Sequence, residues 1–433
     1  MRNRSARWAF AFGVIVMGAA LTGDSIGHAQ IVTGAPQAPA PQILWRAEVG
    51  FQPIDIQAGD ITGDGRPDLV IGYSLRGTPG PSIVAIDSSG QILWRFQTEK
   101  GVWNVAIGDI DGDGINDVAG YDNQLPSFLY AIKNDGTLLW KAQLPITGSG
   151  NEIGDHVKIA DVTGDGRNEV IVGPPGSSIV SIFNKEGVFL YSYSVPASGV
   201  AAIPFIEVAD LSGDGVKDIL ISYGYQCPPC GIRVMDGSGS LLWDFPNTVR
   251  FGNAAIGDID SDGKPDAVVS EFFGTKVSAI SNLGSLLWTL PLQGDTTTVA
   301  LADVKGKGKG SLNVVAGSGT KVNLMDAGGK LLWTLEANAN VFKVLFGEFK
   351  RGGGKGIAAA TMGERTSPGG VLFVDSRGKL KGFLAGDSSA PTENVGFRDL
   401  VVADLDGDGI DEVVAISEDG FAYALQMFSK PKQ

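Results

Sequence analysis

Short apolar runs of strand length alternate with turns along almost the whole chain. In the first clear repeat the runs are Ile54–Ala58, Asp68–Tyr73, Ser82–Asp87 and Gln91–Phe96, joined by short polar loops. Runs of this length between turn residues are typical of β-strands, and short connections favour antiparallel meanders. Glycine supplies 62 of the 433 residues, about twice its usual share, which suits many tight turns. The pattern therefore predicts an all-β chain built from four-stranded units.

A nine-residue motif lies between the first and second strands of these units. Oxygen-bearing side chains occupy positions 1, 3, 5 and 9, and glycine occupies position 6, so one loop can wrap around a hard cation. A single Asp-Gly pair is an ordinary turn former, but repetition with the same four oxygen positions predicts calcium sites. Six copies occur, at Asp60–Asp68, Asp109–Asp117, Asp161–Glu169, Asp210–Asp218, Asp258–Asp266 and Asp404–Glu412.

The ligand set of each loop would combine the side chains of positions 1, 3, 5 and 9 with the backbone carbonyl of position 7. An EF-hand is excluded, because position 12 holds Ile71 in the first copy and Gly120 in the second instead of a bidentate glutamate. The predicted ligands are, copy by copy, Asp60, Thr62, Asp64, Arg66 and Asp68; Asp109, Asp111, Asp113, Ile115 and Asp117; Asp161, Thr163, Asp165, Arg167 and Glu169; Asp210, Ser212, Asp214, Val216 and Asp218; Asp258, Asp260, Asp262, Lys264 and Asp266; and Asp404, Asp406, Asp408, Ile410 and Glu412.

Two further units carry degenerate loops, so the chain holds eight units in all. Lys305 and Lys307 occupy ligand positions in the first of these loops, and Glu348–Lys355 has lost most of its oxygens, so both should be free of metal. The last unit lacks its fourth strand, and an orphan segment at Gln42–Arg46 matches Gln91–Arg95 residue for residue. The orphan should complete the last sheet, which predicts a single eight-bladed β-propeller of four-stranded antiparallel blades closed by its N-terminal strand.

A second repeated element is a glycine turn followed by a Leu-Leu-Trp strand. An aromatic at fixed spacing indicates a packing anchor for each repeat rather than a ligand platform. Tyr191 takes the tryptophan position in one unit, and Gly378–Gly382 is a worn copy. The intact copies end at Trp94, Trp140, Trp243, Trp288 and Trp333.

The metal motif followed by Leu-Val-Ile-Gly resembles FG-GAP/VCBS repeats, the calcium-binding propeller repeats of the integrin α-chain type. Phe251-Gly252 is similar to the FG element and Val172–Pro175 to the GAP element, and the resemblance spans roughly residues 43–428. It implies extracellular calcium-stabilised propellers used in cell adhesion and ligand recognition, and sometimes as scaffolds for polysaccharide enzymes. The turn-plus-tryptophan element also resembles that of quinoprotein-type propellers.

In an antiparallel meander the metal loops and the glycine turns share one face, and the remaining loops form an opposite, more variable face. A column of mostly polar residues stands five residues before each metal loop: Asp55, Asn104, His156, Phe205, Asn253, Thr298, Lys343 and Asp399. We hypothesise that these residues, with Trp103 and Arg398 beside them, ring the channel mouth on the variable face and bind a ligand. The alternative is that the ends of the inner strands are simply hydrated and polar.

The N-terminus predicts export. Three arginines precede the apolar run Trp8–Leu21, and Gly27–Ala29 is a plausible cleavage site, so residues 1–29 resemble a signal peptide. An uncleaved anchor is the alternative. Residues 30–42 form a Pro/Ala-rich linker and residues 429–433 a C-terminal tail. We therefore expect a secreted, periplasmic or cell-surface protein without a transmembrane span after signal cleavage.

The only two cysteines form the motif Cys227-Pro-Pro-Cys230 in a loop between strands. In an exported protein this spacing favours a structural disulfide, with a catalytic dithiol or a zinc site as alternatives. The formal net charge is −14, but 21 carboxylates occupy predicted ligand positions, so much of the acidity belongs to metal loops. Nucleic acid is therefore an unsuitable partner.

No catalytic constellation stands out, which favours a binding protein over an enzyme. We expect an exported calcium-binding propeller, a monomer, that recognises an extracellular protein or carbohydrate ligand and uses calcium structurally. One alternative is a polysaccharide lyase or hydrolase, for which His156, Lys343 and Asp399 would be the candidate residues. The other alternative is a quinoprotein-like propeller with a quinone cofactor.

Overall fold

The computed structural model describes ten ranges of the chain, and every regular element in them is a β-strand. No helix in these ranges is long and apolar enough to cross a membrane. The predicted signal peptide, most of the linker and the C-terminal tail lie outside the described residues. The described ranges are 38–50, 52–73, 81–122, 125–145, 156–174, 176–196, 203–224, 227–305, 312–389 and 393–427.

The strands follow one another as meanders of four, each of which forms a blade. Blade 1 is β2 (Pro53–Gly59), β3 (Asp68–Tyr73), β4 (Ile83–Ile86) and β5 (Ile92–Phe96). Blade 2 is β6 (Val102–Gly108), β7 (Asp117–Asp122), β8 (Phe128–Ile132) and β9 (Leu138–Gln143). Blade 3 is β10 (Val157–Ala160), β11 (Glu169–Val172), β12 (Ile179–Phe183) and β13 (Phe189–Ser194). Blade 4 is β14 (Ile206–Ala209), β15 (Asp218–Tyr223), β16 (Cys230–Met235) and β17 (Leu241–Asn247).

The second half repeats this arrangement. Blade 5 is β18 (Phe251–Gly257), β19 (Asp266–Glu271), β20 (Lys276–Ile280) and β21 (Leu286–Pro291). Blade 6 is β22 (Thr296–Ala302), β23 (Asn313–Ser318), β24 (Lys321–Asp326) and β25 (Leu331–Glu336). Blade 7 is β26 (Asn340–Gly347), β27 (Gly356–Glu364), β28 (Gly370–Val374) and β29 (Leu380–Ala385). Blade 8 is β30 (Asn394–Ala403), β31 (Glu412–Ser417), β32 (Phe421–Gln426) and the N-terminal β1 (Gln42–Glu48).

The N-terminal strand closes the ring, as the orphan segment predicted. β1 pairs antiparallel with β32, from Gln42 opposite Gln426 to Glu48 opposite Phe421. Blades 7 and 8 form one eight-stranded sheet because β27 and β30 extend far enough to pair with each other. Six separate four-stranded sheets complete the described fold, so the eight-bladed propeller is confirmed.

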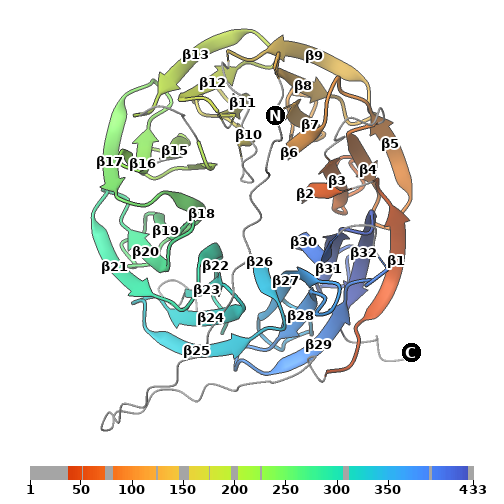
Figure 1. Cartoon of the computed structure of the whole chain (residues 1–433). Helices are drawn as coiled ribbons and strands as arrows, with labels where there is room; N and C mark the ends of the chain where they lie inside the picture. The colour runs from red at the N-terminus through yellow and green to blue at the C-terminus, as the bar shows by residue number, and fades with distance from the viewer. Residues whose placement is uncertain are drawn as a thin grey trace, which may run out of the picture.

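The blades stand around a central axis. Figure 1 shows the first strand of each blade innermost and the fourth strand, such as β5 or β9, on the rim. Small residues end the inner strands because neighbouring blades approach closely there: a Cβ on Gly59 would lie 2.8 Å from Ile107, and one on Gly108 would lie 2.7 Å from Ile159. These glycines therefore allow the inner strands to crowd the axis.

The hydrophobic core consists of eight clusters, each of which spans two neighbouring blades. One cluster joins Ile56 and Leu69 of blade 1 to Val414 of blade 8, and another joins Val70 of blade 1 to Val118 of blade 2. Second strands such as β3 are buried along their whole length because blades cover both of their faces. No blade in the described fold thus has a core of its own.

The rim tryptophans connect neighbouring blades. The indole N–H of Trp94 donates to the carbonyl of Asn134 in blade 2, at 2.8 Å, and its ring covers Gly136 in the same turn. A Cβ on Gly136 would lie 2.7 Å from this ring, and its φ of +86° also favours glycine. The same bond to the next blade's turn is made by Trp45, Trp140, Trp288 and Trp333, and by the Tyr191 hydroxyl. The predicted anchors therefore act between blades.

Ring closure explains why the copy of the tryptophan element at Gly378–Gly382 has no tryptophan. Its strand β29 faces blade 8, whose fourth strand comes from the N-terminus, so β32 and β1 are not joined by a turn. A tryptophan there would find no glycine turn to cover. Instead, the amide of Phe383 donates to the carbonyl of Pro39, at 3.1 Å, just before β1.

The aliphatic residues that precede these tryptophans lie on the surface. Ile92 is 41% exposed and Leu93 38% exposed on β5. The register shifts here, since Ile86 pairs with Ile92 while Ala85 pairs with Trp94, which leaves Leu93 as the bulged residue. The bulge breaks the alternation of the strand on the outermost edge, where no further strand covers it.

We expect Trp94→Phe to weaken the contact between blades 1 and 2 by about 1 kcal/mol, because an aromatic ring is kept at this position while the indole hydrogen bond is lost. Urea unfolding followed by tryptophan-independent far-UV circular dichroism measures this change. The control is the neighbouring exposed Leu93→Ala, which should change the unfolding free energy by less than about 0.5 kcal/mol. Equal effects of both variants would contradict the proposed inter-blade contact.

Candidate functional site

The metal loops fold around their own first carboxylate. In the first copy the amides of Gly63 and Gly65 donate to the two carboxylate oxygens of Asp60, at 2.6 and 2.8 Å. Asp64 accepts the amide of Arg66, at 2.8 Å. Both glycines have positive φ, of +75° and +84°, a conformation that other residues rarely adopt. The copies at Asp109, Asp161 and Asp210 repeat the two bonds to position 1.

The carboxylate at position 9 is buried and connects the loop to the rest of its blade. Asp266 is fully buried, and its Oδ2 accepts the amides of Ile259 and Asp260, at 3.0 and 3.3 Å. Its Oδ1 accepts the amide of Asn282 in the turn between β20 and β21, at 2.9 Å. Asp117 likewise receives the amide of Asn134 on its Oδ1, at 3.0 Å. Position 9 thus couples a metal loop to a turn that a rim tryptophan contacts.

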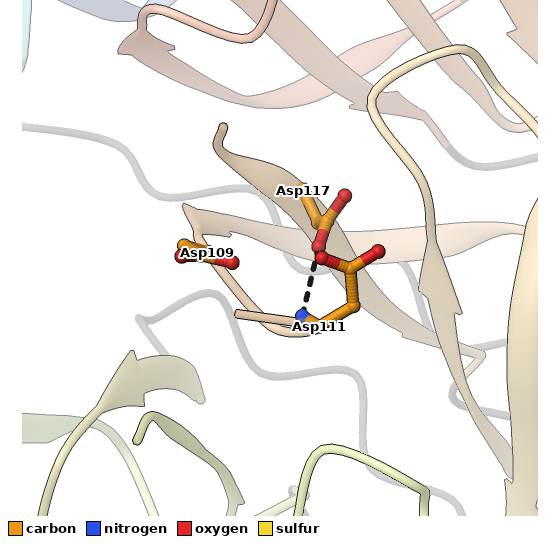
Figure 2. A group of neighbouring side chains, drawn as sticks. All are labelled: Asp109, Asp111 and Asp117. Atoms are coloured by element: carbon orange, nitrogen blue, oxygen red, sulfur yellow. Dashed lines mark hydrogen bonds between the residues drawn. The ribbon is translucent and has the colours of Figure 1, made fainter. Parts of the chain in front are cut away.

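Three of the six loops bring three carboxylates together in the described structure. In each group the candidate ligand atoms lie within 4.8 Å of one another. Figure 2 shows Asp109, Asp111 and Asp117 converging, with the amide of Asp111 bonded to Asp117. These loops have aspartate at position 3, whereas the other three have Thr62, Thr163 or Ser212 there. The groups are Asp109, Asp111 and Asp117; Asp258, Asp260 and Asp262; and Asp404, Asp406 and Glu412.

Burial makes the charge at position 9 unfavourable without a nearby cation. Removal from water raises the pKa of this carboxyl in every intact loop, and raises that of Glu412 to about 7. A bound cation would favour the ionised form. Oxygen-only donor sets of this kind fit a hard cation such as calcium. The predicted ligand sets therefore agree chemically with a divalent cation, and a metal ion can be held by at least the three carboxylate groups.

Consecutive loops also contact one another. The side-chain amide of Asn116, at position 8, donates to the carbonyl of Asp60 in the preceding loop, at 2.8 Å. Asn168 makes the same bond to Asp109, at 2.8 Å. The ammonium group of Lys264, at position 7, donates to the carbonyl of Ser212, at 2.7 Å. The loops therefore form a connected arc on one face of the propeller.

The degenerate loops keep part of this hydrogen bonding. Glu348 takes the place of the first aspartate in blade 7, and its Oε1 accepts the amide of Gly352, at 2.8 Å. The guanidinium of Arg351 bonds to the carbonyl of Asp408 in the metal loop of blade 8. In blade 6, Lys305 is described but Lys307 lies outside the described residues. The absence of metal from these two loops stays a prediction.

Most residues of the polar column are buried and bonded between blades, whereas Asn253 and Lys343 are half-buried. Asp55 accepts the amide of Val105 in blade 2, at 2.8 Å, and is 2% exposed. Asn104 and the fully buried His156 share a hydrogen bond of 2.6 Å between blades 2 and 3. The remaining pairs are Asn253 with the amide of Val299, at 3.0 Å, and Lys343 with Asp399, at 3.5 Å. Inner strands are so close here that their polar side chains meet across the blade interface.

Trp103 and Arg398 lie one residue earlier, where the inner strands bulge. The register of β6 shifts between Val102 and Asn104, which leaves Trp103 as the bulged and half-buried residue. Arg398 occupies the corresponding place in β30 and forms an ion pair with the buried Glu418, at 2.8 Å. A bulge redirects a side chain out of the regular alternation. A ligand-binding role of these two residues stays a prediction, as it does for the polar column.

An exposed aromatic loop on the variable face was missed by the sequence reasoning. Phe273, between β19 and β20, is 74% exposed and has a φ of +56°. The guanidinium carbon of Arg250 lies 4.0 Å from the ring centre of Phe272 and 5.5 Å from that of Phe273. The sequence Phe272-Phe273-Gly274 could have indicated this exposed loop, since two adjacent aromatic residues in a short hairpin turn cannot both be buried easily. Positive φ in a non-glycine residue marks a locally strained backbone.

The cysteine pair lies in the corresponding loop of blade 4. The Sγ atoms of Cys227 and Cys230 are bonded, and the second cysteine begins β16. The bond closes a short loop between β15 and β16 on the variable face. No zinc ligand set is formed by the described residues around it, since the metal-competent groups in those ranges are the three carboxylate groups.

Comparison with known proteins identifies the repeat and the fold. Residues 109–172 and 161–221 match the FG-GAP-like repeat, so the chain contains this repeat. No curated protein matches the chain in sequence. The V. cholerae biofilm matrix protein Bap1 shares the fold at a TM-score of 0.62 with 15% identity, over 90% of this chain and 91% of that one.

Two further solved structures have the same architecture. BBS1N, in complex with ARL6DN, has a TM-score of 0.56 at 12% identity and covers 91% of this chain and 99% of its own. The Dos1 propeller has a TM-score of 0.59 at 12% identity, over 90% and 95% of the two chains. The structural similarity establishes a shared β-propeller fold. At sequence identities this low it says nothing about the ligand or the partner, which have to be argued from this chain's own residues.

We expect Asp266→Asn to lower the unfolding free energy by about 2 kcal/mol in buffer containing EDTA. The amide keeps one acceptor oxygen but places an NH2 group against buried backbone N–H groups, so at least one hydrogen bond is lost. Urea denaturation measures the change. Asp262→Asn in the same loop is the control, because the exposed side chain keeps its acceptor for the amide of Lys264. Similar losses in both variants would contradict a linking role of position 9.

Proposed function

We propose that this chain is an exported β-propeller that is stabilised by calcium in six loops and recognises a ligand through its variable face. The observation that carries the proposal is the buried carboxylate at position 9. It bonds the metal loop through one oxygen and, in blades 2 and 5, the turn under the neighbouring blade's tryptophan through the other. A cation in the loop would therefore stabilise the contact between blades.

Calcium would supply positive charge where the fold concentrates carboxylates. In the loop of blade 5, three exposed or half-exposed carboxylates approach within 4.8 Å, and like charges at this distance repel. A calcium ion that binds only the folded chain stabilises it by about 2.7 kcal/mol per site at one hundred times its Kd. Because each blade depends on its neighbours, this stabilisation would extend around the ring.

The variable face is the proposed recognition surface. Its loops differ from blade to blade, whereas the metal loops repeat the same residues on the opposite face. Functional residues concentrate on variable loops held by a rigid scaffold. Phe273 offers a large apolar contact there, and the nearly buried Arg250 supports its neighbour Phe272. An exposed aromatic beside a guanidinium is suited to a carbohydrate or protein ligand.

Export is part of the proposal. A basic segment, an apolar run and a small-residue site precede residue 30, and the chain's two cysteines form a disulfide. An exported chain would meet a much higher calcium concentration than a cytosolic one.

Mass spectrometry of the protein recovered from its native host should show a mature N-terminus at Gln30.

We expect EDTA to lower the Tm of the mature chain and added calcium to restore it. Asp406→Ala should reduce the number of bound calcium ions by one, because it removes a carboxylate from the group at Asp404. Isothermal titration calorimetry and differential scanning calorimetry measure the two effects. The control is Lys305→Ala in a degenerate loop, which should leave the stoichiometry unchanged. A Tm that does not respond to EDTA would refute structural calcium.

We expect the mature chain to bind one class of glycan or an extracellular protein through the loop at Phe273. A glycan array, followed by a surface pull-down if the array is empty, identifies the ligand. Phe273→Gly should then weaken binding about tenfold or more, while the Tm is unchanged or higher because the positive φ suits glycine. Leu283→Ala, which removes an equally exposed side chain from the metal face, should leave binding intact. Equal binding by both variants would exclude this loop.

A further inference from the structure

The side chain of Lys133 extends into the metal loop of blade 2 from the turn between β8 and β9. Its Nζ lies 2.6 Å from Oδ2 of Asp111 and 2.9 Å from Oδ2 of Asp113. These carboxylates hold positions 3 and 5 of the loop, where a calcium ion would find two of its oxygens. An ammonium group and a calcium ion cannot both use the same oxygens at close range, because their charges repel.

The lysine is not needed to build its own turn. Elsewhere the first residue of this turn has a side-chain oxygen that caps the turn, as when Asp87 accepts the amides of Ser89 and Gln91. In blade 2 this capping is done by Asp135, which accepts the amide of Thr137 at 2.9 Å. The corresponding residues of the other blades with this turn are Asp87, Asn184, Asp236, Ser281, Asp326 and Asp375. None of them is cationic, so the lysine side chain is specific to the second loop.

The turn that carries Lys133 also holds the contact between blades 1 and 2. The next residue, Asn134, donates its amide to the position-9 carboxylate of Asp117 and accepts the indole N–H of Trp94. An ammonium group in the loop neutralises two of its carboxylates without any metal. The loop, the turn and the tryptophan contact can then keep their arrangement when calcium is scarce.

We propose that Lys133 is an internal cation that competes with calcium for the second metal loop. This inference rests on the proposed calcium function. The second loop accordingly binds calcium more weakly than the comparable loop of blade 5, and the blade 1–2 junction depends less on calcium than the other junctions do. Lys133 lowers the calcium affinity of the second loop, and the blade 1–2 junction stays formed when calcium is absent.

The first test replaces the lysine with the residue found in blade 3. In the full mature chain, Lys133→Asn should tighten one calcium site about tenfold, since two partly exposed ion pairs no longer have to be broken. In EDTA the same variant should have a lower Tm than the parent chain, because Asp111 and Asp113 then repel each other. Calcium titration and melting curves with calcium or EDTA measure both effects. A merely structural lysine would lower the Tm in both buffers and leave calcium affinity unchanged.

The second test transfers the lysine to blade 5. Ser281→Lys with Leu283→Asp converts that turn to the Lys-Asn-Asp-Gly sequence of blade 2, and Asp260 and Asp262 hold the loop positions that Asp111 and Asp113 hold in blade 2. One calcium site should weaken about tenfold. The transfer leaves the net charge unchanged, because the added lysine and the added aspartate offset each other. Lys330→Asn, which removes an exposed lysine from a turn beside a degenerate loop, is the charge-matched control for Lys133→Asn and should leave all affinities within twofold.

The outcomes separate this inference from the proposed function. A parent chain that binds no calcium overturns both. A parent chain that binds calcium, with affinities unchanged in Lys133→Asn and in the blade 5 transfer, overturns the role of Lys133 and leaves calcium stabilisation in place. If Lys133→Asn does not fold, the blade 5 transfer decides: a weakened site supports the inference, and an unchanged site overturns it.

Discussion

The structure depends on ring closure, because its hydrophobic core lies between blades and not within them. Each of the eight clusters is shared by two neighbours, and the cluster of blades 8 and 1 exists only if β1 pairs with β32. A blade removed from this ring would expose both of its apolar faces. The rim tryptophans add a polar and aromatic contact at most of these junctions, so cohesion is distributed around the circle.

The metal loops share in this cohesion through the carboxylate at position 9. It is buried, and it accepts backbone amides both from its loop and, in blades 2 and 5, from the turn of the same blade. A cation at the loop would therefore act on the junction and not on the loop alone. Lys133 shows that the chain itself can supply part of this positive charge, at a loop next to the blade 1–2 contact.

The two ends of the inner strands serve different purposes. At the metal face the strands end in glycine or alanine and crowd together, and nearer the variable face they carry polar residues. Those polar residues are used to connect blades, as the bonds of Asp55 and of Asn104 with His156 illustrate. The proposed recognition surface lies in the loops beyond the strands, where Phe273 is exposed.

The sequence by itself determined the strands, the metal motif, the number of blades and the closure, because each repeats at a fixed spacing or matches a missing element. The absence of a tryptophan from Gly378–Gly382 also follows from the repeat, since blade 8 has no glycine turn for a tryptophan ring to cover. Tertiary structure decided what repetition does not encode. Most of the polar column is buried because inner strands meet near the axis, and Leu93 is exposed because a bulge on the outermost strand breaks the alternation. The contact of Lys133 with Asp111 and Asp113 joins residues about twenty positions apart, and only the folding of the blade brings them within hydrogen-bonding distance.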